Sequence, residues 1–140
     1  MLWEVGDLEQ LFAGDDLSDI AGMVKRFEQM TGCEIVVRIT NDKIMPEKAA
    51  RAEFVKLGLD KAANGAGILL YVNLFQHKLI LLAGAGITEK LGETWLQQQI
   101  DRLSDRFRKY QFGFGIHDTV SRMAIDLKEH FPPSDKDVSQ

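Results

Sequence analysis

Apolar residues recur at helical spacing in four stretches of the chain. The first runs from Leu17 to Met30, with an apolar side chain every three or four residues. The second begins at Pro46, a residue that suits the first turn of a helix, and ends near Gly58. Two more extend from about Glu93 to Lys109 and, after the turn YQFGFG, from about Ile116 to His130. The pattern predicts four amphipathic helices.

Three shorter stretches have the composition of β-strands. In Cys33–Thr40 the residues alternate between an apolar face and a mixed face. Ala66–Leu74 is almost continuously apolar, which is typical of a central strand covered on both faces. Lys78–Leu82 is a third apolar run. Only Asn73–His77 joins the last two runs, and because this is too short for a helical crossover, we expect an antiparallel hairpin.

The order helix, strand, helix, hairpin, helix, helix predicts an α/β fold. We expect a three-layer α/β/α sandwich around a small mixed sheet of three to four strands, with helices on both faces. The connection from the strand at Cys33 to the strand at Ala66 contains a helix, so it should be a right-handed crossover if those strands are parallel. The two helices before the hairpin and the two after it are expected to cover opposite faces.

Composition narrows the class of protein. The chain has 140 residues, 45% of them hydrophobic and 27% charged, which is an ordinary globular composition of single-domain length. The net charge is −4 and basic residues form no long run, so nucleic acid is not an expected partner. Cys33 is the only cysteine, which excludes an internal disulfide and the usual zinc motifs. We interpret Cys33 as a structural thiol.

The two ends of the chain differ from the middle. Residues 1–16 are an acidic N-terminal extension with a weak amphipathic pattern, which suits a short docking helix and lacks the features of a signal peptide. Residues 17–133 form the predicted domain, and residues 134–140 are an expected disordered tail. No apolar run approaches the roughly 20 residues that a membrane span needs, so a soluble, cytoplasmic protein is the expectation.

Five motifs, in order, resemble one known family. They are TGCEIVVRI, MPEKAARAEFVKLGL, NGAGILLYV, LLAGAGITEKLGETW and FRKYQFGFGIHDTVSRMAIDLKEHFP. The chain resembles the TPM domain, which is shared by thylakoid-lumen acid phosphatases, a photosystem II repair protein and a nematode modulator of acetylcholine receptors. The closing HFPP is most similar to the soluble bacterial branch. The resemblance implies the same α/β/α fold, and it brings calcium binding and acid phosphatase activity, reported for some members, as expectations.

The segment LLAGAGITEKLG has the outline of a phosphate-binding turn. A dinucleotide fingerprint would need a third glycine three residues after Gly86, where this chain has Glu89, and it belongs between parallel strands. No GxxxxGK[ST] motif occurs either. Gly84 and Gly86 are therefore interpreted as positions of positive φ or close packing. The soluble branch usually has Gly-Asp-x-Gly-Ile here, and this chain lacks that carboxylate.

Three loops supply the candidate ligand-binding residues. The first loop follows the strand at Cys33, the second is a turn with left-handed φ, and the third is the glycine turn after the hairpin. We expect them to meet in one crevice at one end of the sheet. The candidate residues are Asn41, Asp42, Asn64, Gly65, Gly84 and Gly86. Asp42 is the one candidate metal ligand, with calcium as the cation that the resemblance implies.

The sequence favours a binding or regulatory domain over an enzyme. No Ser-His-Asp arrangement with an elbow motif, no histidine phosphatase signature and no Cys-x5-Arg loop occurs, so no catalytic residue is assigned. The expected partner is a protein or a small ligand. The alternative is a weak acid-phosphatase-like hydrolase, with or without a divalent cation. A cation-dependent hydrolase would require convergent carboxylates.

Overall fold

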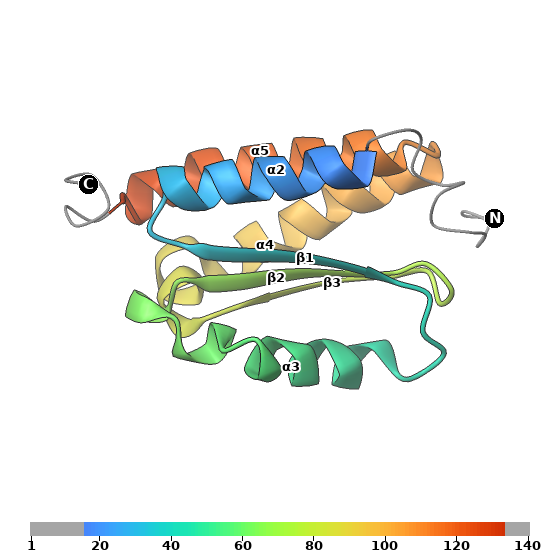
Figure 1. Cartoon of the computed structure of the whole chain (residues 1–140), viewed down its shortest axis with the longest axis horizontal. Helices are drawn as coiled ribbons and strands as arrows, with labels where there is room; N and C mark the ends of the chain where they lie inside the picture. Colours follow the sequence, from blue (N-terminus) through green and yellow to red (C-terminus); the bar gives the residue numbers. More distant parts are fainter. Residues whose placement is uncertain (1–15, 134–140) are drawn as a thin grey trace.

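The computed structural model describes residues 16–133 of the chain (Figure 1). The elements, in chain order, are α2 (Asp16–Met30), β1 (Glu34–Thr40), α3 (Pro46–Lys56), the 3₁₀ turns η1 (Leu59–Lys61) and η2 (Ala63–Gly65), β2 (Gly67–Asn73), β3 (Lys78–Ala83), α4 (Ala85–Arg108) and α5 (Phe112–His130). The predicted docking helix and the predicted tail lie outside the described residues.

The three strands form one mixed sheet in the order β1-β2-β3. β1 and β2 are parallel because α3 and the two 3₁₀ turns carry the chain back between them. β2 and β3 are antiparallel because only residues 74–77 join them. All seven residues of β2 are buried, as the continuous apolar run predicted for a central strand.

The helices cover the sheet unequally, as Figure 1 shows. α2, α4 and α5 pack on one face, whereas α3 alone covers the other. The three-layer sandwich is confirmed, but the expected division of two helices per face is wrong. The expectation was wrong because α2 packs on the same face as α4 and α5. That face carries the odd-numbered residues of β1 and the even-numbered residues of β2, and α2 contributes Ile20 and Met23 to its core.

Two helices begin earlier than the sequence predicted. α4 starts at Ala85, not near Glu93, because Gly84 has an extended conformation that serves as its N-cap. The periodicity was obscured by Gly92, whose φ of 88° and ψ of 161° interrupt the helix. α5 starts at Phe112, so the segment predicted to be a turn is largely helical, and the chain instead reverses around Tyr110 with a φ of 59°.

Cys33 behaves as a buried structural thiol. Its side chain belongs to the larger core, and burial raises its pKa from 9.0 to about 11. Because the thiolate is the reactive form, we expect thiol reagents to react about a hundredfold more slowly with the folded protein than with the unfolded chain.

The same shift sets a pH dependence of stability. Between pH 9 and about 11 the unfolded chain loses the thiol proton while the folded chain keeps it, so the free energy of unfolding falls as pH rises. Urea denaturation across that window measures the slope. The extra fall should be absent from Cys33→Ala, and an identical slope in both proteins would contradict this assignment.

Candidate functional site

The structure separates the candidate residues into two groups at opposite ends of the sheet. Asn41 and Asp42 follow the carboxyl end of β1, where Thr40 pairs with Asn73. The other four residues lie where β2 begins and β3 ends, next to the pairing of Ile68 with Ala83. Strands of this length span about 20 Å, so the single crevice predicted from the sequence is wrong. The prediction failed because the Asn64 turn precedes β2, which is parallel to β1, and because the antiparallel β3 returns the glycine turn to that same end.

Close backbone packing explains the glycines at that end. Asn64 and Gly65 have left-handed φ values of 60° and 64°, as an Asn-Gly turn predicts. A Cβ on Gly84 would lie 2.5 Å from the Gly65 carbonyl oxygen, and one on Gly86 would overlap the Asn64 carbonyl oxygen. Close packing, and not positive φ, is therefore the reason for Gly84 and Gly86. They let the η2 turn contact the start of α4.

A hollow of about 640 Å³ lies beside this packed turn. The ammonium group of Lys90, which lines the hollow, already has partners. Lys90 donates a hydrogen bond of 3.3 Å to the carbonyl oxygen of His130, and its ammonium lies 4.8 Å from the centre of the Phe131 ring. Glu89 also lines the hollow and would oppose an anion. These contacts fasten the end of α5 to the start of α4.

The opposite end carries a polar groove between β1 and α3, which we call the α3 groove. It encloses about 580 Å³ and is lined by Arg38, Ile39, Thr40, Asp42, Ile44, Ala49, Ala52, Glu53, Lys56 and Tyr71. Its size is within the usual range for small-molecule sites, and it lies at the carboxyl end of a parallel strand. Of the residues predicted from the sequence, Asp42 lies in this groove and Asn41 directly precedes it.

Two amides of the hairpin hold the Asp42 loop in place. The side chain of Asn73, which is fully buried, donates a hydrogen bond of 3.0 Å to the Asp42 carbonyl oxygen and accepts one of 2.9 Å from the Gln76 N–H. The side chain of Gln76 also donates to the carbonyl oxygens of Asp42 and Ile44. The position of Asp42 is thus set by the β2–β3 hairpin as well as by β1.

An ion pair and a buried tyrosine line the α3 groove. The guanidinium of Arg38 forms an ion pair with the carboxylate of Glu53 from α3. Tyr71, from β2, is 3% exposed. Burial raises the pKa of the Tyr71 phenol, and the negative charge of Asp42 raises it further. Asp42 and Tyr71 both line the α3 groove.

Replacing Asp42 with Asn should lower the pKa of Tyr71. The substitution removes a negative charge that opposes phenolate formation, whereas burial remains, so the pKa should stay above its ordinary value. Ultraviolet absorbance during an alkaline titration measures this change. A Tyr110→Phe background leaves Tyr71 as the only titrating tyrosine of the chain's two. An unchanged pKa would show that Asp42 does not face Tyr71.

A family model matches most of the chain. The family model TPM_phosphatase, described as the TPM domain, matches residues 5–125. The chain belongs to the TPM domain family. The resemblance seen in five sequence motifs is thereby confirmed.

Solved structures share the fold of this TPM domain. The NMR structure of the BA42 protein from the psychrophilic bacterium Bizionia argentinensis matches with a TM-score of 0.81 and 19% identity, over 95% of this chain and 92% of that one. The N-terminal domain of a P. gingivalis protein, also solved by NMR, matches with a TM-score of 0.70 and 20% identity, over 85% of this chain and 78% of that one. No curated protein matches. At these identities the likeness shows the fold alone.

The described part of the TPM domain has neither a cluster of metal-ligating side chains nor a membrane-spanning helix. Within residues 16–133 no three or more His, Cys, Asp or Glu side chains gather as metal ligands would. Asp42 as a calcium ligand therefore stays a prediction. Among the helices of the same region, none is long and apolar enough to cross a membrane. The cytoplasmic location expected from the sequence is also still a prediction.

Sequence reasoning missed most of the α3 groove. Arg38 and Tyr71 are on adjacent strands that pair directly, and Glu53 and Lys56 are three residues apart on α3. The charge of Arg38 within an otherwise apolar strand was a usable signal, because a strand residue of that kind needs a partner. Which helix supplies that partner follows only from the side of the sheet that α3 occupies.

Proposed function

We propose that this TPM domain is a binding module for a small polar ligand held in the α3 groove. The observation that carries the proposal is that the Asp42 carboxylate and the Lys56 ammonium both line the groove, and neither side chain forms an ion pair or hydrogen bond with another described residue. Arg38, by contrast, is paired with Glu53. Unpaired groups of opposite charge suit a ligand that carries both an anionic and a cationic group.

The groove also offers apolar contacts to such a ligand. Ile44 and Ala49 line it beside the charged groups, together with the buried Tyr71. Small-molecule sites commonly combine apolar walls with a few placed polar groups. Because Asn73 and Gln76 hold the Asp42 loop, little ordering of that loop would be needed on binding.

Phosphoethanolamine is a suitable probe because it joins a phosphate to an ammonium group. Calorimetry should show it binding at least about tenfold more tightly than inorganic phosphate or ethanolamine alone, since two charged contacts are made together. Asp42→Asn and Lys56→Gln should each reduce its affinity to that of the single-charge probes. Equal affinity for all three probes, or no effect of either substitution, would refute the proposal.

A hydrolase is the second candidate function. The family model is named for a phosphatase. The α3 groove combines two carboxylates, of Asp42 and Glu53, with two basic side chains, of Arg38 and Lys56. In this alternative Asp42 would bind a divalent cation such as calcium, which would polarise the phosphoryl oxygen. Turnover of p-nitrophenyl phosphate that needs calcium and is lost in Asp42→Asn would favour the hydrolase. We expect no such turnover.

A further inference from the structure

β1 is an edge strand whose outer side faces away from the sheet. In the part of the chain that the structure describes, β1 pairs with β2 alone. The Glu34 N–H donates to Ala66 and the Thr40 carbonyl accepts from Leu74, so the even-numbered residues bond to β2. In a parallel pair the backbone groups of the intervening residues then point outward. The backbone N–H and C=O groups of Ile35, Val37 and Ile39 therefore lie on the outer side of β1.

One of these outward groups is already used. The N–H of Ile35 donates a hydrogen bond of 2.8 Å to the carboxylate of Glu28 from α2. Another strand therefore cannot accept a hydrogen bond from the N–H of Ile35 at the start of β1. The outward backbone groups of Val37 and Ile39 lie further along, where no such side chain covers them among the described residues.

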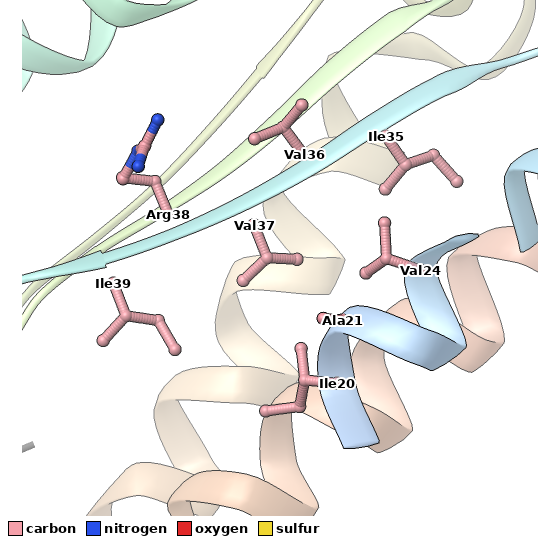
Figure 2. A pocket seen from close by; sticks show the side chains of 8 residues that line it. All are labelled: Ile20, Ala21, Val24, Ile35, Val36, Val37, Arg38 and Ile39. Carbon is pink, nitrogen blue, oxygen red and sulfur yellow. The ribbon is translucent and has the colours of Figure 1, made fainter. Parts of the chain in front are cut away.

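An apolar groove, the α2 groove, follows this edge. It encloses about 400 Å³ and is lined by Ile20, Ala21 and Val24 of α2 and by residues 35–39 of β1. Figure 2 shows Ile35, Val37 and Ile39 pointing toward α2, whereas Val36 and Arg38 point to the other side of the strand. The edge thus has an apolar side toward α2 and a positive charge toward α3.

We propose that the β1 edge binds an extended peptide of alternating apolar and acidic residues. Such a peptide would add a fourth strand, with hydrogen bonds to Val37 and Ile39, as in other cases of β-strand addition. Its apolar side chains would enter the α2 groove, because residues directly opposite each other share a face. The intervening residue would lie beside Arg38, whose side chain is 46% exposed despite its pairing with Glu53. Charge complementarity selects an acidic residue there.

A second copy of the chain fits this edge less well. Antiparallel pairing of two β1 strands centred on Arg38 would place two guanidinium groups opposite each other. Pairing centred on Val36 or Val37 would require the outward N–H of Ile35, which Glu28 already occupies. A peptide with an acidic residue opposite Arg38 avoids both conflicts.

A blocked peptide of alternating Val and Thr with one central Glu tests the proposal. Titrated into ¹⁵N-labelled full-length protein, it should shift the amides of Val37 and Ile39 and bind about tenfold more tightly than the same peptide with central Lys. Arg38→Glu should reverse that preference. No shift at these amides, whether because residues 1–15 or a second copy already pair with β1, would overturn the proposal, as would equal binding of both peptides.

Val37→Pro removes an outward N–H that the pairing with β2 does not use, so it should abolish peptide binding and leave the β1–β2 pairing intact. Val37→Thr keeps that N–H and is the matched control. If the proline variant fails to fold, Ala21→Glu places a charge in the α2 groove from an exposed position and should also abolish binding. Undiminished binding to either would overturn the proposal. Ala21 lies outside the α3 groove, so Ala21→Glu should leave phosphoethanolamine affinity unchanged, and failure here is distinguishable from failure of the α3-groove proposal.

Discussion

Gly86→Ala is expected to lower the free energy of unfolding by about 3 kcal/mol, because among the described glycines an added Cβ at Gly86 would come closest to another atom. The added Cβ would overlap the backbone carbonyl oxygen of Asn64. Neither partner is the end of a flexible side chain, so the η2 turn and the start of α4 would have to separate. Urea denaturation followed by circular dichroism measures the loss.

Gly22→Ala is the matched control for that substitution. Gly22 lies within α2, and an added Cβ would come no nearer than 3.6 Å to a protein atom, at the end of the Arg26 side chain. Alanine is favoured over glycine in a helix interior by roughly 0.5–1 kcal/mol, so this variant should be slightly stabilised. Equal stability changes in the two variants would contradict the close packing inferred for Gly86.

Asn73→Ala should cost about 2–4 kcal/mol of stability and loosen the loop that carries Asp42. The fully buried amide makes two hydrogen bonds, to the Asp42 carbonyl oxygen and from the Gln76 N–H. Truncation removes both hydrogen bonds and leaves the Asp42 carbonyl oxygen and the Gln76 N–H without this partner. Leaving buried polar groups unpaired costs more stability than the hydrogen bonds contribute. Urea denaturation gives the stability, and amide hydrogen exchange of residues 41–44 reports the loop.

Gln76→Ala separates this buried role from a surface one. The Gln76 side chain also donates to the Asp42 carbonyl oxygen, but in an exposed setting where water can replace it. We expect a loss of about 1 kcal/mol or less. If Gln76→Ala destabilises the protein as much as Asn73→Ala, then Asn73 is not the residue that fixes the loop.

The hydrophobic pattern was sufficient to predict most of the fold. The continuous apolar run of β2 identified the central strand, and the short connection to Lys78 required a hairpin. The number of helices on each face could not be predicted in this way. An amphipathic stripe shows that a helix packs on something, whereas the face it occupies depends on the handedness of the crossover and on the path of α4 after β3.

The candidate site was harder to predict for a related reason. Asn64 and Gly86 are in contact with each other, as expected. They are a strand's length from Asp42 because Asn64 precedes β2, which is parallel to β1, and the antiparallel β3 brings Gly86 back to that end. Lys56 was overlooked because a charged residue at the end of a helix is usually just solvated. Its place in the lining of the α3 groove depends on α3 packing alone on its face of the sheet.

The position of the ligand site is tested most directly by following the backbone amides during titration with phosphoethanolamine. We expect saturable shifts at Arg38, Asp42 and Lys56, which line the α3 groove, and none at the glycine turn. Shifts confined to Asn64, Gly86 and Lys90, at the other end of the sheet, would contradict it.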